Sequence, residues 1–153
     1  MAYYARPEDI LSRFKELFEA NKEQLGLFYV ALQEESLIPE FPYLQIVAGP
    51  AARDIHARQQ FEVDFTFVFW IYHANLAVGH AMRSVEDMEL ATGVVRFLHQ
   101  PDNRRLVLDG ENKLVFSFVT AEIPGLIQPE TGPAIIATRL TWNGKSVVNY
   151  NDA

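Results

Sequence analysis

The sequence predicts a soluble, single-domain α+β protein: a mostly antiparallel or mixed sheet with a long central strand, packed against two amphipathic helices. Three observations predict this class. The chain has 153 residues, 49% of them hydrophobic, which suits one domain with its own core. Two segments repeat apolar residues at helical spacing. A third segment alternates apolar and polar residues over more than ten positions.

Residues 7–24 are expected to form the first helix. Its apolar face collects residues at 3.6-residue spacing: Ile10, Phe14, Leu17, Phe18 and Leu25. Pro7 suits the first helical turn, and Gly26 is a fitting stop. Residues 27–33 fit a strand and a helix equally well, so their structure stays open.

A short strand is expected over residues 43–47, after a proline-bounded loop. Gly49 and Pro50 follow directly and are typical of a strand end. Residues 51–57 lack apolar periodicity, so we expect them to form a mobile connection.

Residues 58–72 give the clearest strand signal in the chain. One face is apolar throughout: Phe61, Val63, Phe65, Phe67, Phe69 and Ile71. The other face changes from polar to apolar along the strand: Glu62, Asp64, Thr66, Val68, Trp70 and Tyr72. About fifteen residues span roughly 50 Å, which exceeds the roughly 30–35 Å expected for the domain core. Part of the strand should therefore project or bend through a bulge. Because the second face becomes apolar around Val68, another element must cover Trp70, and we expect the second helix rather than a neighbouring subunit to do so.

The second helix is expected to begin after Ser84, following a loop over residues 73–83. Ser84 and Asp87 stand at the spacing of a capping box. The apolar arc of this helix is Met88, Ala91, Val94, Val95 and Leu98, and Pro101 lies beyond its end.

The last third of the chain predicts two hairpins. The first joins residues 106–108 to residues 113–120, pairs Val107 with Leu114, and follows a solvent-facing Arg104-Arg105. Residues 123–132 contain Pro and Gly and are expected to form a mobile loop. A strand over residues 135–142 then meets Asn143-Gly144, a strong hairpin signal, and should return through residues 145–150.

The sequence holds no recognisable catalytic or metal-binding motif, and we expect no enzyme activity, no metal and no cofactor. It has no cysteine and no glycine-rich phosphate loop. No two of its histidines stand four residues apart: His56, His73, His80 and His99. Glu62 and Asp64 share a strand face, but they are better explained as charges that protect an exposed strand than as an acid/base pair.

The net charge of −7 argues against a protein that grips nucleic acid, because such affinity comes from Lys and Arg. It does not exclude a surface that DNA slides past. The longest apolar stretch, residues 65–72, is far too short to span a membrane.

The order of these elements resembles the tail terminator proteins of long-tailed bacteriophages. The resemblance covers nearly the whole chain as one domain, residues 1–153, and rests on five segments: the helix Ile10 to Phe18, the strand Phe41 to Val47, the alternating strand Phe61 to Ile71, the helix end Val94 to Leu98, and the closing strand Ala137 to Trp142. The Asn143-Gly144 hairpin departs from the pattern and puts the C-terminal end of the comparison in doubt.

The resemblance implies a structural virion protein, assembled in the host cytoplasm, that forms a homo-hexameric ring. Such a ring caps the tail tube, joins it to the head-tail connector or stopper protein, and lets genomic DNA pass through its lumen without specific binding. It implies no catalytic residue and no membrane contact. Our candidate residues for the contact between subunits are Phe67, Trp70, Tyr72, Arg53 and Arg58.

Two alternatives remain. The first is another neck or head-closure connector protein, which the sequence does not separate from a terminator. The second is a hot-dog-like enzyme acting on acyl thioesters, with Asp64 or Glu86 as the base and the aromatic strand lining an acyl pocket.

Overall fold

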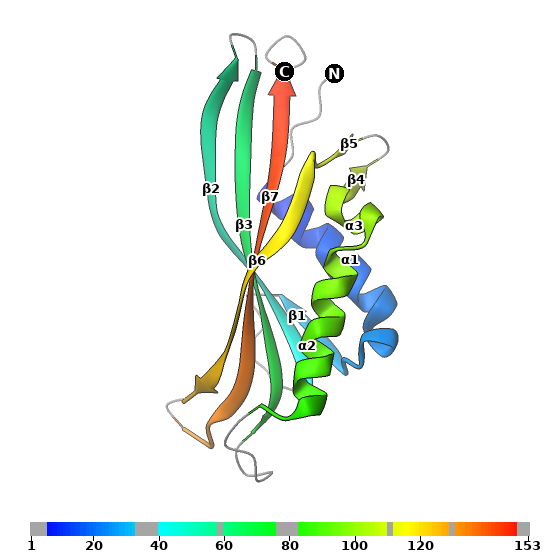
Figure 1. Ribbon diagram of the computed structural model, residues 1–153, viewed down its shortest axis with the longest axis vertical. Helices are drawn as coiled ribbons and strands as arrows, with labels where there is room; N and C mark the ends of the chain where they lie inside the picture. The colour runs from blue at the N-terminus through cyan, green and yellow to red at the C-terminus, as the bar shows by residue number, and fades with distance from the viewer. Residues whose placement is uncertain are drawn as a thin grey trace.

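The computed structural model describes residues 6–32, 40–57, 60–75, 83–109, 112–128 and 131–149. These residues form two layers, a five-stranded sheet with three helices on one of its faces (Figure 1). The elements are, in order, α1 (Pro7–Leu25), β1 (Tyr29–Leu32), β2 (Tyr43–Ala57), β3 (Gln60–Asn75), α2 (Val85–Leu98), α3 (Pro101–Arg105), β4 (Val107–Asp109), β5 (Asn112–Lys113), β6 (Phe116–Ile127) and β7 (Ile135–Asn149). The predicted α+β class is confirmed.

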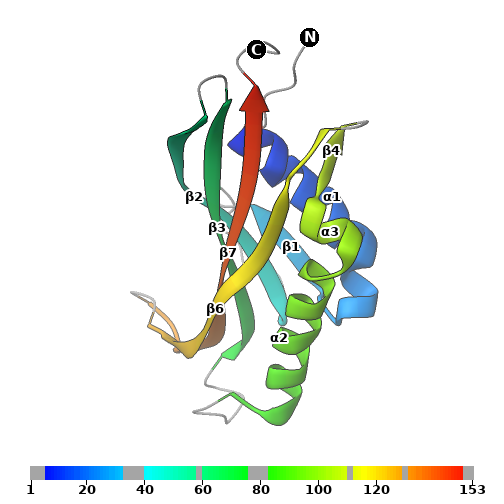
Figure 2. The ribbon, with the colours of Figure 1, turned by 45° about the horizontal axis from the view of Figure 1, so that its top comes forward.

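The sheet is mixed. Its strand order is β1-β2-β3-β7-β6, with β1 parallel to β2 and every other pair antiparallel. β3, with 16 residues, is the third of these five strands. The sheet is strongly twisted, so its strands overlap near the middle of the view in Figure 1 and fan out above and below it, whereas the turned view of Figure 2 shows them side by side. β4 and β5 form a separate two-stranded ribbon.

Local signals set both ends of α1. Pro7 occupies its first turn, and Gly26 ends the helix in the left-handed conformation at φ 78°, which glycine adopts without the steric cost of a Cβ. Ile10, Phe14 and Phe18 are buried against the sheet. The predicted helix is confirmed, and residues 29–32, left open above, are the strand β1.

The start of α2 is fixed by the predicted capping box. The backbone N–H of Asp87 donates to Ser84 Oγ at 3.1 Å, and the backbone N–H of Ser84 donates to Asp87 Oδ2 at 3.1 Å. Pro101 begins α3, a short helix of a single turn that carries Arg104 and Arg105. The sequence did not predict this helix.

The core between the two layers is aromatic. Phe14 packs edge-on against the rings of three sheet residues, with centroid distances of 5.6 Å to Phe67, 4.9 Å to Phe69 and 4.9 Å to Trp142. Phe18 adds a contact to Phe97 of α2 at 5.1 Å. Since each of these rings is at most 8% exposed, they exclude water from the middle of the molecule.

The predicted end of the second strand at residues 49–50 is wrong. β2 continues to Ala57, and Gly49 and Pro50 lie in a bulge between Ala48 and Ala51. A Cβ on Gly49 would stand 2.8 Å from the carbonyl oxygen of Thr66 on β3, which explains why a residue without a side chain occurs there. The segment expected to be a mobile connection, residues 51–57, therefore pairs with β3.

The predicted Asn143-Gly144 hairpin is also wrong. β7 runs straight through both residues, because each pairs with a strand on either side: Asn143 with Thr66 and Phe118, Gly144 with Phe65 and Ser117. Pairing with two neighbouring strands outweighs the local turn preference.

Two further predictions fail around β6. β4 pairs Val107 with Lys113 rather than with Leu114, which instead turns into the core at 1% exposure. β6 leaves that ribbon and joins the main sheet, where it pairs with β7 as far as Ile127. Much of the expected loop over residues 123–132 is therefore strand.

Gly144 and Gly93 offer a matched test of this packing. A Cβ at Gly144 would meet the Trp142 ring and lie 2.9 Å from Leu114 Cδ1, whereas nothing described lies within 4 Å of one at Gly93 on α2. We expect Gly144→Ala to lower the free energy of unfolding by about 1–3 kcal/mol. Gly93→Ala should raise it by about 0.5–1 kcal/mol, through the helix preference of Ala. Urea denaturation measures both, and a Gly144→Ala chain as stable as the wild type would contradict the packing described.

Candidate functional site

The face of the sheet turned away from the helices, here called the open face, is the first candidate for a functional surface. Along β3 the buried Phe67, Phe69 and Ile71 point to the helices, so the half-buried residues between them point the other way. The strand pairings extend this face across the sheet to Gln45, Val47, Val68, Trp70, Tyr72, Phe116, Phe118, Ile123 and Arg139. No described helix covers it.

Stacked aromatic rings occupy one part of the open face. Tyr72 stacks on Tyr43 at a centroid distance of 4.4 Å and on Trp70 at 6.3 Å. The guanidinium of Arg139 lies 5.9 Å from the Trp70 ring, and the Tyr72 hydroxyl donates to Gln45 Oε1 at 2.8 Å. Burial raises the pKa of Tyr72 above its usual value, so its hydroxyl stays protonated. Among these residues only Arg139 is charged, and aromatic rings make up most of the surface.

The other part of the open face lies at the sheet edge formed by β6. Phe116 and Phe118 stack with centroids 6.0 Å apart and are 39% and 41% exposed, while Ile123 on the same strand is 48% exposed. Lys145 lies over Phe116 at 5.8 Å and forms ion pairs with Glu62 at 3.2 Å and Asp64 at 3.9 Å. An edge strand with this many exposed apolar side chains is typical of a contact surface.

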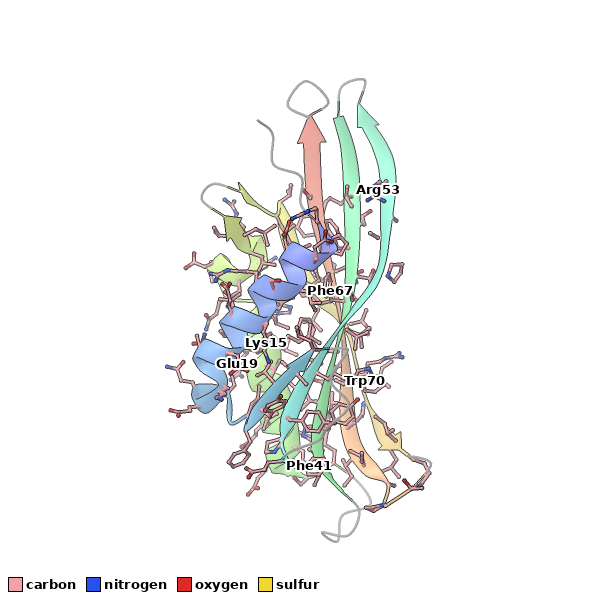
Figure 3. All side chains as sticks on the ribbon, turned by 180° about the vertical axis from the view of Figure 1, so that it is seen from behind. Lys15, Glu19, Phe41, Arg53, Phe67 and Trp70 are labelled. Carbon is pink, nitrogen blue, oxygen red and sulfur yellow. The ribbon has the colours of Figure 1, made fainter. Side chains whose placement is uncertain are left out.

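The predicted interface residues fall in different places. Trp70 and Tyr72 lie on the open face, and Arg53 is exposed on β2 (Figure 3). Phe67 is in the core at 1% exposure, so its assignment to a subunit interface is wrong; it belongs to the apolar alternation that faces α1. Arg58 lies outside the described residues.

The expectation that α2 covers Trp70 is wrong as well. α2 packs its buried residues, among them Ala91, Val94 and Leu98, on the opposite face of the sheet. Trp70 points away from α1, whereas Phe67 lies between α1 and the sheet (Figure 3).

A polar cluster on the helix side of the sheet brings together side chains that the sequence did not link. His73 Nε2 lies 2.8 Å from Thr138 Oγ1, and Arg83 Nη1 donates to the same hydroxyl at 3.1 Å. Because the Thr138 hydroxyl oxygen accepts from Arg83, the hydroxyl proton is available to donate to His73 Nε2. The neutral His73 ring then carries its own proton on Nδ1. His73 Nδ1 lies 3.6 Å from Asp87 Oδ1. Arg83 also lies 3.5 Å from Glu122 of β6.

This cluster has the acid, imidazole and hydroxyl order of hydrolase triads, but it lacks access for a substrate. Thr138 is fully buried, and the His73 ring is 0% exposed. The cluster instead connects the start of α2 to the sheet. Asp87 lies near His73 of β3, and Arg83 contacts Thr138 of β7 and Glu122 of β6. Its sequence positions are far apart, so only the sheet register reveals it.

The His73 cluster predicts a loss of stability in mild acid. Burial lowers the pKa of His73, the Asp87 carboxylate opposes that shift, and Arg83 adds to it. As pH falls below about 6.5, the unfolded chain therefore takes up a proton before the folded chain does, and the free energy of unfolding falls. In urea titrations at pH 7.5, 6.5 and 5.5, His73→Gln should show less of this loss than the wild type. Identical pH profiles would contradict it.

The residues proposed for an acyl-thioester enzyme do not meet. Asp64 is exposed on the open face and pairs with Lys145, whereas Glu86 is exposed in the first turn of α2, on the helix side. The helix-facing side of the aromatic strand is filled by Phe14 and Phe18 rather than hollow.

The structure describes the side chains of two histidines. His99 Nε2 accepts a hydrogen bond from the backbone N–H of Val119 at 2.9 Å, and His73 belongs to the polar cluster with Thr138 and Arg83. The described ranges contain no group of three His, Asp or Glu side chains able to hold a metal ion.

No protein-family model matches the chain, and no curated protein sequence matches it either. Among the described helices, none has the length and apolar character needed to cross a membrane.

Proposed function

We propose that this chain is a structural subunit of a phage neck, a tail terminator that closes into a ring on the tail tube and joins it to the head connector. The observation that carries the proposal is the mismatch between the two layers. The 16 residues of β3 span about 50 Å, whereas the 19 residues of α1 span about 29 Å. The helices therefore leave part of the sheet without cover (Figure 1).

Among the described strands, the sheet has two different free edges, and this supports a ring. β6 is one edge. On the other side β1 pairs only with residues 43–46 of β2, so the rest of β2 is also an edge. A contact between two different surfaces repeats from subunit to subunit and closes into a ring when its rotation allows. The number of subunits, six, comes from the family resemblance alone.

The charge distribution agrees with a ring through which DNA passes. The chain has 20 acidic and 13 basic residues. Several described basic side chains are already paired with acids: Arg6, Arg13, Lys15, Lys22, Arg83 and Lys145. Acidic residues outnumber basic ones by seven, so DNA phosphates would meet a surface that does not hold them.

Native mass spectrometry over a range of protein concentrations, with and without the tail tube protein from the same genome, tests the proposal. We expect a closed species of about six copies, favoured by high concentration or by the tube protein. A monomer or a two-fold dimer under every condition would overturn it.

A further inference from the structure

We propose that one contact between neighbouring copies joins the acidic start of α2 on one copy to a basic hollow beside α3 on the next. This inference rests on the proposed ring and names the surfaces that meet in it. The hollow, of about 310 Å³, is lined by Pro101, Arg104, Arg105, Val115 and Phe116. It lies between α3 and the beginning of β6.

The hollow combines unpaired positive charge with apolar surface. Arg104 and Arg105 are exposed, and neither guanidinium has an ion-pair partner within the described parts of the chain. Val115 is 50% exposed beside them, and Phe116, whose ring stacks on Phe118 on the open face, also lines the hollow at the β6 edge of the sheet. An occupant that fits this surface carries carboxylates next to apolar side chains.

The first turns of α2 carry that combination. Val85 is 68% exposed and Met88 is 45% exposed, which is unusual for large apolar residues of a helix that otherwise packs on the core. Glu86 and Glu89 are exposed beside them and have no ion-pair partner among the described side chains. The two surfaces thus carry opposite charge, and each also exposes apolar side chains that a contact between them would bury.

The two surfaces cannot meet within one chain. The 14 residues of α2 measure about 21 Å from end to end, and α3 lies beyond the far end of that helix (Figure 1). They lie in the same layer, at opposite ends of it. A second copy shifted along this layer brings one surface to the other, which gives a head-to-tail contact of the kind that builds rings.

The absence of native cysteine allows a direct test by disulfide trapping. The full-length Met88→Cys/Val115→Cys chain, oxidised at high protein concentration, should give a ladder of disulfide-linked oligomers. Bridging requires Cα atoms within about 7 Å, so a ladder reports this contact specifically. The matched control, Glu23→Cys/Val115→Cys, moves one cysteine to the exposed end of α1 and should give no ladder.

Charge reversal tests the same contact in a second way. Arg104→Glu/Arg105→Glu and Glu86→Lys/Glu89→Lys should each weaken self-association at least about tenfold, and a chain with all four changes should recover most of the loss. Arg96→Glu, on α2 but outside the residues that line the hollow, should have little effect. Circular dichroism checks that each variant is folded.

The outcomes separate this inference from the proposed function. Rings that form without a disulfide ladder, or that tolerate either reversal alone, would overturn this contact and leave the ring standing. Loss of association in one reversal with no recovery in the combined chain would also overturn it. That result would mean that the two surfaces do not face each other across the contact. A chain that never forms rings would overturn the proposed function itself.

Discussion

Replacing Trp142 with Ala should lower the free energy of unfolding by about 3–5 kcal/mol, the range for truncating a large core aromatic. Trp142 is 0% exposed and packs edge-on against Phe14 of α1 at 4.9 Å and Phe67 of β3 at 5.6 Å. It also covers Gly144, so its loss opens a cavity where β7 meets α1. Chemical denaturation followed by circular dichroism measures the change.

Trp142→Phe is the matched control for this prediction. The buried indole N–H has no hydrogen-bond partner among the described residues, so removing it costs no hydrogen bond. Phe keeps most of the apolar volume, and we expect less than half the loss seen with Ala. A Trp142→Ala chain that unfolds at the same urea concentration as the wild type would contradict the description of the core.

Replacing Trp70 with Ala should impair assembly far more than folding, and replacing its neighbour Phe69 should do the reverse. Phe69 is 0% exposed between Phe14 and Phe18, so Phe69→Ala should cost about 3–5 kcal/mol of stability. Trp70 is half-buried, and Trp70→Ala removes its stacking on Tyr72 and the Arg139 contact, about 1–2 kcal/mol together, without opening a cavity in the core. The two residues are adjacent, which makes the comparison a control for any local change in β3.

The assembly effect of Trp70→Ala follows from the exposure of the open face. If that face is buried between subunits, an aromatic at its centre should contribute at least about 2 kcal/mol, a factor of roughly 30 in the association constant. Sedimentation velocity on folded wild-type and variant chains measures it. Unchanged association of Trp70→Ala would remove the open face from the contact surface.

Elements with local signals were predictable from the sequence. Pro7 and Gly26 bound α1, and the Ser84–Asp87 capping box fixes the start of α2, because these residues act through hydrogen bonds and dihedral angles of their own turn. Alternation along β3 also separated its two faces correctly, and it already placed Phe67 with the core residues. Phe67 lies on the apolar face of that alternation, which is why it is buried and cannot contact a neighbouring subunit.

Elements that depend on distant partners were not predictable. Gly49-Pro50 and Asn143-Gly144 have strong turn preferences, but pairing along β2, β3, β7 and β6 outweighs them. The same holds for the candidate surfaces. Arg105 and Phe116 line one hollow, and His73 meets Thr138, only because the sheet register and α3 bring these residues to the same places.

The most direct test of the account is cryo-electron microscopy of the particle made by the genome that encodes this chain, with the protein located by antibody labelling. If the chain is the proposed ring subunit, we expect a six-fold ring at the junction of tail tube and head connector, with the free edges of the sheet and the open face buried between subunits. A single copy, a two-fold dimer, or absence of the protein from the particle would contradict it.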